Sequence, residues 1–468
     1  MISSTNLNEA HEHSHSEILD RYGLVRGLGL LQATALNMSN MVGVGPFLTI
    51  PMIIASMNGP QCMLGWALGT LLAICDGLIW SELAAAMPGT GGTFLYLRES
   101  FARTRFARLI PFLFIWQFIF SGPLEIASGY IGFAQYVSYF WRSMGAWESR
   151  AVAAAVGVLV VALLYRNIGG VGRLTVVLWS GMLITVAAVI GTGLIHFQPA
   201  VAFDFPPGAF NLTRGFALGL GGAMLIAMYD FLGYYDVCYV AGEVRNPERV
   251  IPRSILISVV LVALIYSVMN LTIIGVVPWR EAMQSKFIAA EMMDRAWSGA
   301  GPGSAASWTG GITTVMILWT SLTSCFALTL GFSRIPFAAA LDGYFFPIFT
   351  RLHPSGKFPH VSLAVVGGLA ILAGMLSLDW VLPALITARI LIQFIGQIAA
   401  VILLRKTRRD IDRPFRIWLY PLPLVVAFAG WSFIFLTSGW VFILYGVGSL
   451  AAGVVAFWLW ERQQTPLV

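Results

Sequence analysis

The sequence predicts an all-α membrane protein with twelve transmembrane helices, and its composition and hydropathy support this class. Of the 468 residues, 58% are hydrophobic and 11% are charged, whereas soluble domains carry about 25% charged residues. Mean hydropathy is +0.79, and apolar runs close to the ~20 residues that cross a bilayer recur along most of the chain. One membrane domain surrounded by the lipid bilayer is the simplest organisation.

Short polar or charged segments separate the apolar runs and place the ends of the predicted spans. A tail at 1–26 precedes a ten-helix core at 27–404, a basic loop with helices eleven and twelve covers 405–460, and a second tail covers 461–468. The twelve predicted spans cover residues 27–57, 60–87, 109–140, 150–165, 174–195, 213–240, 254–278, 309–333, 361–378, 381–404, 417–437 and 440–460.

The distribution of Lys and Arg sets the orientation of the chain. Of the 28 Lys and Arg residues, six fall in segments on one side, Arg389 falls within a span, and the other 21 fall on the side that holds both tails. Because cytoplasmic loops are enriched in Lys and Arg, we expect a multi-pass plasma-membrane protein with both termini in the cytoplasm. The first 26 residues lack an apolar core behind a basic stretch, so we expect the first span to direct insertion, without a cleavable signal peptide.

Several other kinds of site and function find little support in the sequence. The net charge of +6 follows the membrane topology, so we expect no nucleic-acid partner. His11, His13 and His15 lie in a polar tail without a fixed scaffold, so we expect no metal and no cofactor there. The sequence contains no HExxH or GxSxG motif and no paired intramembrane His, so we expect no catalytic residues and no enzyme activity.

The first predicted span contains residues that an uninterrupted membrane helix disfavours. Between Asn37 and Met52 it reads NMSNMVGVGPFLTIPM, with two Asn, one Ser, two Gly and Pro46 near mid-depth. Gly permits backbone angles that leave a helix, and Pro46 suits the first turn of a new one. We therefore predict two half-helices that meet around Gly43 and Gly45. Such a break is tolerated in a membrane only where protein or a wet cavity surrounds it.

The sixth predicted span has a matching break. Asp230, Gly233 and Asp236 interrupt its apolar sequence, so we predict a second half-helix that starts near mid-depth. If spans one to five and six to ten form two repeats of opposite topology, spans one and six hold equivalent positions, and such pairs of broken spans mark the binding sites of transporters. Glycines at ordinary helix contacts would explain Gly233 but not the two acids.

Two further charges lie inside predicted spans. Glu125 lies near the middle of span three, and Arg389 lies part-way along span ten. A charged residue at the centre of a membrane helix costs about 2.5–3.5 kcal/mol on insertion scales, so Glu125 needs a partner or water. An ion pair between Glu125 and Arg389 and a substrate-binding role for Glu125 both satisfy this requirement.

Four segments resemble motifs of the amino acid-polyamine-organocation superfamily, and together they cover most of the chain. Gly43–Phe47 (GVGPF) resembles the Gly-x-Gly-Ile-Phe motif of helix one, and Ser81–Gly92 resembles the Ala-Glu-Leu, Pro and Gly-Gly pattern of helix two. Gly242–Arg253 resembles the Glu-x-x-x-Asn-Pro signature after helix six, and Arg413–Arg416 resembles the Arg-Pro-Phe-Arg before helix eleven. The chain is therefore similar to permeases of the L-type amino acid transporter-like and polyamine-uptake branches.

This resemblance implies a LeuT-like fold of two inverted five-helix repeats with broken helices one and six, followed by two extra helices. It also implies alternating access around a central site, with the substrate carboxylate at the start of the second half of helix one and the amine near carbonyls of the broken helices. The charges of half-helix ends favour the same arrangement. The substrate-binding residues that we expect are Met41, Val42, Gly43, Val44, Gly45, Phe47, Glu125, Met228, Tyr229, Asp230, Phe231 and Gly233.

Two departures from the family pattern concern the substrate and its coupling. Pro46 replaces an Ile and removes one backbone N–H from the anion site, and it resembles the Gly-Pro-Phe of polyamine-uptake members. A polyamine has no carboxylate and would bind to acids, which Glu125, Asp230 and Asp236 could supply. Span five lacks the Lys that many proton-coupled relatives carry, so a coupling proton would bind to a carboxylate such as Asp230 or Glu125.

We therefore expect a secondary active amino acid permease, with polyamine uptake as the alternative. A non-transporting sensor on the same fold is less favoured, because the short tails leave little room for a signalling domain. The expected partners are a small-molecule substrate and, for a symporter, a coupling proton. The sequence leaves open which amino acid or polyamine is moved, the coupling ion, the choice between uptake and exchange, and the oligomeric state.

Overall fold

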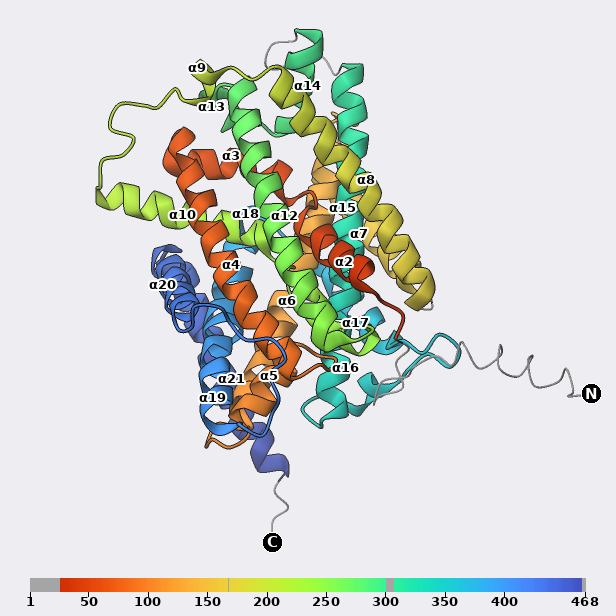
Figure 1. The fold of residues 1–468 in the computed structure, drawn as a ribbon. Coiled ribbons are helices and arrows are strands. Elements are labelled where there is room, and N and C mark those ends of the chain that lie inside the picture. The colour runs from red at the N-terminus through yellow and green to blue at the C-terminus, as the bar shows by residue number, and fades with distance from the viewer. Residues whose placement is uncertain (1–25, 167, 300–306, 465–468) are drawn as a thin grey trace, which may run out of the picture.

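The computed structural model describes residues 26–166, 168–299 and 307–464, which form a bundle of helices (Figure 1). Within these ranges, one isolated parallel bridge between Leu28 and Val244 is the only pairing of extended backbone. The tail histidines that we considered as metal ligands, His11, His13 and His15, lie outside the described residues.

The elements are labelled α for α-helices and η for shorter 3-10 or π segments. The first part of the chain holds α2 (Leu30–Met41), α3 (Gly45–Met57), η2 (Pro60–Cys62), α4 (Met63–Ala86), α5 (Thr93–Phe101), α6 (Leu109–Val137), α7 (Ala146–Leu164), α8 (Ile168–Ile195) and α9 (Pro199–Ala202). The middle part holds α10 (Arg214–Phe231), α11 (Asp236–Tyr239), η3 (Ala241–Glu243), α12 (Pro247–Val276), α13 (Trp279–Ala282) and α14 (Ile288–Ser298). The last part holds α15 (Trp308–Phe332), α16 (Arg334–Leu341), η4 (Pro347–Thr350), α17 (His360–Ala373), α18 (Leu378–Arg389), η5 (Ile390–Phe394), α19 (Ile395–Thr407), α20 (Leu422–Thr437) and α21 (Trp440–Gln464).

Each predicted span coincides with a helix or a pair of successive helices. Among the described residues, eight helices are long and apolar enough to cross a membrane, and the bent pair α2 and α3 brings the number to nine. Predicted spans six, nine and eleven coincide with α10, α17 and α20, which do not belong to this group. The structure therefore supports a multi-pass membrane protein, while the twelve crossings and the two inverted repeats stay predictions.

Spans one and six are both interrupted, but in different ways. Helices α2 and α3 meet at an angle of 44° across a break of a few residues. Helix α10 ends at Phe231, and Gly233 then turns the chain with φ of 109°, which few residues other than Gly adopt. The four-residue helix α11 and η3 follow, so the second half-helix predicted for span six is short. Asn246, with φ of 46°, and Pro247 then start α12.

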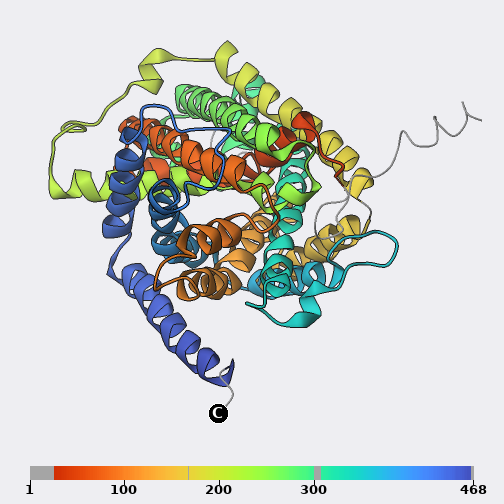
Figure 2. The same ribbon diagram turned by 60° about the horizontal axis from the view of Figure 1, so that its bottom comes forward.

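The interrupted helices lie inside the bundle. Helix α10 packs against α3 and α4, α2 packs against α8, α12 and α15, and α6 packs against α15, α17 and α18. Helices α20 and α21 lie at one edge of the bundle (Figures 1 and 2), where α21 packs against α6 and α18. The long helices expose apolar side chains such as Leu159, Val260 and Leu264, as expected for helices that face lipid.

A buried ion pair joins the segment after span six to the end of span eight. Arg334 Nε donates to Glu243 Oε1 at 2.7 Å, and Arg334 Nη2 donates to Oε2 at 3.2 Å. The two side chains are only 3% and 2% exposed. The backbone carbonyl of Glu243 also accepts the N–H groups of Gly27 and Leu28 at 3.0 and 2.9 Å. Glu243 therefore ties the start of span one and the end of span eight to the break of span six.

We expect Arg334→Met to destabilise the protein strongly. The variant retains apolar volume but leaves Glu243 buried without a cation, and removal of one partner of a buried pair costs roughly 3–5 kcal/mol. The measurement is the thermal denaturation of the purified protein in detergent. Arg103→Met is the control, because Arg103 and Asp410 are 59% and 49% exposed and such pairs contribute about 1 kcal/mol at most. Equal losses of thermal stability in the two variants would contradict a structural role for the pair of Arg334 and Glu243.

Candidate functional site

The break in span one leaves backbone N–H groups without partners at the start of α3. Within the described residues, the N–H groups of Val44 and Gly45 donate to no acceptor, whereas Gly43 N–H donates to Met41 O at 3.0 Å. Pro46, in the first turn of α3, has no N–H. Free N–H groups at a helix N-terminus, together with the helix dipole, favour a bound anion.

The two Asn side chains of α2 stabilise the other break. Asn37 Oδ1 accepts the N–H of Val237 at 3.0 Å, and Asn40 Nδ2 donates to Asp236 Oδ2 at 2.6 Å. Gly233 lies against Asn40 so closely that a Cβ atom would overlap it. The polar residues that made span one unusual therefore satisfy groups that the interruption of span six exposes.

One tyrosine joins the carbonyl ends of both interrupted helices. The hydroxyl of Tyr266, on α12, lies 2.7 Å from Met41 O and 3.1 Å from Asp230 O. Its ring packs against Trp66 and Phe231, with centroid separations of 5.0 and 5.4 Å. Tyr266 therefore combines a packing role with a polar role at the two breaks.

A small cavity lies between the two breaks. About 30 Å³ is open to the centres of water-sized molecules, which is room for about two or three waters. Its wall combines the break of span one with parts of α6, α10 and α15. The residues that line it are Asn40, Met41, Gly43, Val44, Gly45, Glu125, Ser128, Gly129, Tyr229, Asp230, Leu232, Ser324 and Leu328.

Asp230 supplies an acid with a free oxygen at this cavity. Thr49 Oγ1 donates to Asp230 Oδ2 at 2.5 Å, while Oδ1 has no hydrogen-bond partner in the described part of the chain. A Cβ atom added to Gly45 would lie 2.7 Å from Oδ1, so the carboxylate faces the start of α3. The cavity thus places a carboxylate oxygen next to the free N–H groups of Val44 and Gly45, and it can bind a cationic and an anionic group side by side.

Glu125 is paired with Arg389, one of the two arrangements that the sequence left open, while contact between Glu125 and substrate stays a prediction. Arg389 Nη1 donates to Glu125 Oε2, and Arg389 Nε donates to Ser121 Oγ at 3.1 Å. The guanidinium also lies 5.2 Å from the ring centroid of Phe332. Glu125 still lines the cavity, but its charge is balanced. Asp230 is therefore the cavity acid that has no cationic partner among the described residues.

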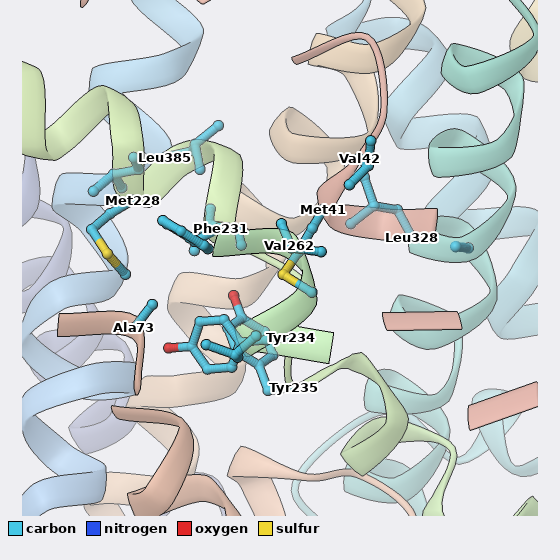
Figure 3. Close-up of a cluster of buried hydrophobic side chains, with 14 of the residues drawn as sticks. Met41, Val42, Ala73, Met228, Phe231, Tyr234, Tyr235, Val262, Leu328 and Leu385 are labelled. Atoms are coloured by element: carbon cyan, nitrogen blue, oxygen red, sulfur yellow. The ribbon is translucent and has the colours of Figure 1, made fainter. Parts of the chain in front are cut away.

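The structure brings seven of the predicted site residues to the cavity and places five elsewhere. Val42, Met228 and Phe231 belong to a cluster of buried hydrophobic side chains (Figure 3). Phe47 is buried, and its carbonyl accepts the Tyr136 hydroxyl at 3.2 Å. Those that line the cavity are Met41, Gly43, Val44, Gly45, Glu125, Tyr229 and Asp230; those that do not are Val42, Phe47, Met228, Phe231 and Gly233. Substrate contact by any of them stays a prediction.

The sequence reading missed other lining residues, chiefly on α6 and α15. Ser128 Oγ donates to Glu125 O at 2.6 Å, so the Tyr229 hydroxyl at 2.8 Å acts as donor to Ser128. Ser324 and Leu328 lie four residues apart on one face of α15, and both line the cavity. Single hydroxyls in apolar spans were the available signal, but many such hydroxyls bond only to the preceding turn.

Comparison with known proteins gives consistent matches over nearly the whole chain. The amino acid permease family model matches residues 28–459. The chain is 24% identical over 461 residues to the branched-chain amino acid permease BcaP of Bacillus subtilis, covering 95% of each protein. It is 26% identical to the serine/threonine exchanger SteT of the same organism, covering 88% of this chain and 91% of SteT. It is 27% identical to the aspartate-proton symporter of B. subtilis, covering 85% of this chain and 76% of the symporter.

We expect Tyr266→Phe to lower stability, because the variant removes the hydroxyl shared by two buried carbonyls at the breaks. Asp230 O loses its donor, whereas Met41 O keeps the N–H of Gly43, and one buried carbonyl left without a donor costs about 1–3 kcal/mol. Thermal denaturation in detergent measures the loss. Tyr235→Phe is a matched control, since Tyr235 is also fully buried and its hydroxyl has no partner among the described residues. It should be neutral or slightly stabilising. A Tyr266→Phe variant as stable as Tyr235→Phe would rule out the bridging role.

Proposed function

The chain belongs to the amino acid permease family of the amino acid-polyamine-organocation superfamily, and from this premise we propose that it is a secondary active amino acid transporter with its substrate site between the breaks of spans one and six. One observation supports this location of the substrate site. Free N–H groups of Val44 and Gly45 lie beside a free oxygen of Asp230 at the same cavity.

This pairing suits the backbone of a zwitterionic amino acid. An α-amino acid carries its ammonium and its carboxylate on neighbouring atoms, so the two groups need adjacent partners of opposite character. The carboxylate binds the N–H groups of Val44 and Gly45 at the start of α3, and the ammonium binds Asp230 Oδ1. Both interactions are charge-assisted hydrogen bonds in a site shielded from water, which are the stronger kind.

The small size of the cavity bears on how the site operates. A space for two or three waters is too small for an amino acid, so the site must enlarge when substrate enters. The breaks at Gly43 and Gly233 are positions where the chain can bend without loss of regular helix hydrogen bonds. Movement of α3 and α10 about these breaks would open the cavity to one side of the plasma membrane at a time, as alternating access requires.

Uptake of a polyamine is the second candidate, and the acids near the breaks are the reason to test it. A polyamine needs two or more free acids. The charge of Glu125 is balanced by Arg389. Asp236 accepts a hydrogen bond from Asn40, and Asp236 does not line the cavity. Asp230 is the lining acid without a cationic partner among the described residues, so the charge arrangement favours an amino acid over a polyamine.

Reconstitution of the purified protein in liposomes tests the function. Uptake of labelled leucine is measured with and without a pH gradient, in competition with lysine, glutamate and spermidine. We expect uptake of leucine and competition by other amino acids. Competition by spermidine alone would support polyamine uptake, and binding without any uptake would support a sensor, so either result would overturn the proposal.

We expect Asp230→Asn to weaken the binding of leucine by about tenfold. The amide keeps the size of the side chain but replaces a charge-assisted hydrogen bond with a neutral one, which loses about 1.4 kcal/mol. Scintillation proximity binding in detergent measures the change. Lysine binding should fall to a similar extent, because the α-ammonium is common to both amino acids. Unchanged leucine binding would exclude Asp230 as the ammonium site.

We expect Gly45→Ala to abolish uptake. The added methyl group would lie 2.7 Å from Asp230 Oδ1 and 3.4 Å from Tyr229 Cε1, where it fills the space between the cationic and anionic subsites. Gly368→Ala, on α17, is the control, since nothing lies within 4 Å of its added Cβ. Both variants are assayed for liposome uptake at equal protein incorporation. Normal uptake by Gly45→Ala would place the substrate site elsewhere.

A further inference from the structure

Several buried acids without a cationic partner lie outside the cavity, among them Asp76, Asp236 and Asp294. Asp76, on α4, is 0% exposed and does not line the cavity between the breaks. Trp80 Nε1 donates to its Oδ2 at 3.0 Å, and Trp431 Nε1, on α20, donates to its Oδ1 at 3.3 Å. The third donor is the hydroxyl of Tyr234, which also bonds to Oδ2.

All the groups around Asp76 are uncharged. In the described part of the chain, no Lys, Arg or His from α4, α10, α12, α19 or α20 contacts its carboxylate. The titratable side chains nearby are Cys75 on α4, and Tyr234 and Tyr235 in the segment after α10. Burial of an anion without a cation carries a large electrostatic cost, which a bound proton removes.

The buried glutamates of the bundle are neutralised in a different way. Glu82, Glu125 and Glu243 each pair with an Arg side chain. An arginine stays charged under all physiological conditions and keeps its partner ionised. Asp76 and Asp236 have no such partner, and of these two Asp76 is the one bonded to a hydroxyl, a group that can both donate and accept a hydrogen bond.

The three donors differ in what they can do when a proton arrives. An indole N–H only donates, so Trp80 and Trp431 cannot accept a hydrogen bond from a protonated carboxyl group. A phenol hydroxyl donates and accepts, so Tyr234 can. When a proton from water adds to Asp76 Oδ2, the new O–H donates to the Tyr234 oxygen, and the hydrogen of Tyr234 turns away from the carboxyl group. The reverse step returns the proton to water.

Tyr234 lies where a change in its hydrogen bond to Asp76 can affect the break in span six. It directly follows Gly233, the residue that turns the chain between α10 and α11, and it lies four residues after Asp230. Figure 3 shows Tyr234 and Tyr235 beside each other below the cluster that contains Phe231. The Asp76 bond therefore ties the break of span six to α4, and through Trp431 to α20.

We propose that Asp76 binds the proton that drives transport, and that Tyr234 passes its protonation to the break in span six. This inference rests on the transport function proposed above and separates the proton site from the substrate site. Protonation reverses the hydrogen bond between Asp76 and Tyr234, and thereby changes the balance between conformations of the segment that carries Asp230.

The test compares exchange with accumulation in liposomes under a clamped membrane potential. Without a gradient, the wild-type protein and the variants Asp76→Asn and Tyr234→Phe should exchange leucine to a similar extent. With a gradient of one pH unit and one coupled proton, the wild type should accumulate leucine up to about tenfold. Asp76→Asn and Tyr234→Phe should reach equal concentrations on both sides, because proton binding or its transmission is lost.

The variant Trp431→Phe distinguishes this proposal from a purely structural role of the hydrogen bonds to Asp76. It removes a hydrogen bond to the same carboxylate but no group that can accept a proton, and its ring can still stack on Phe394. It should accumulate leucine as the wild type does. Loss of accumulation in Trp431→Phe, or its persistence in Asp76→Asn or in Tyr234→Phe, would overturn the proposal.

Two further results distinguish this inference from the proposed function. A wild-type protein that exchanges leucine but does not respond to the pH gradient overturns proton binding at Asp76 and leaves the transport function intact. A protein that neither exchanges nor takes up amino acids overturns both. Infrared difference spectra between low and high pH give a direct readout: the carboxylic acid band should be present in Tyr234→Phe and lost in Asp76→Asn.

Discussion

The need to satisfy backbone polar groups inside a membrane governs this structure. A helix that stops within the bilayer leaves carbonyl and N–H groups without partners, and lipid offers none. Here Tyr266 bonds to the carbonyls of Met41 and Asp230, and Asn37 accepts the N–H of Val237. The N–H groups of Val44 and Gly45 have no acceptor within the described residues, and both residues line the cavity. The groups left over after internal pairing are those available to a ligand.

The buried acids show how one charge type can serve different purposes. Glu125, Glu82 and Glu243 are each neutralised by an Arg and hold helices together. Asp230 keeps a free oxygen at the cavity, and Asp76 is surrounded by neutral donors. A cation partner stabilises an acid in one state, whereas neutral partners allow it to bind a substrate ammonium or a proton. Under the proposals above, the glutamates paired with Arg are structural, whereas Asp230 and Asp76 bind the substrate ammonium and the proton.

Both interrupted spans meet at the site, but they contribute in different ways. Helix α3 is a full second half-helix and presents its N-terminal end to the cavity. The segment after α10 is mostly irregular, and its conformation depends on contacts with Asn40, Asp76 and Arg334. A segment held by side-chain contacts can change its conformation at a lower cost than a regular helix. This makes the span-six segment the more suitable one to transmit a change of state.

Much of this organisation could be read from the sequence, because membrane helices follow simple rules of length and polarity. The apolar runs predicted the helices, the Gly and Pro residues predicted the break at Gly43–Pro46, and four motifs predicted the family. Candidate residues taken from short stretches were less accurate. Met228 and Phe231 lie three residues apart and pack into the core, while Tyr229 and Asp230 between them line the cavity, because neighbours on a helix face different sides.

The sequence by itself determined which residues carry charge within the membrane and where the helices break, since both depend only on local residue type. The tertiary structure decided what each of these residues does. Glu125 pairs with an Arg 264 residues away, and Asp76 receives a hydrogen bond from Tyr234, 158 residues away. Such partners are set by the packing of distant helices, so no local pattern could assign them. An acid in a membrane helix indicates a structural or functional role, and its neighbours in space determine which role it has.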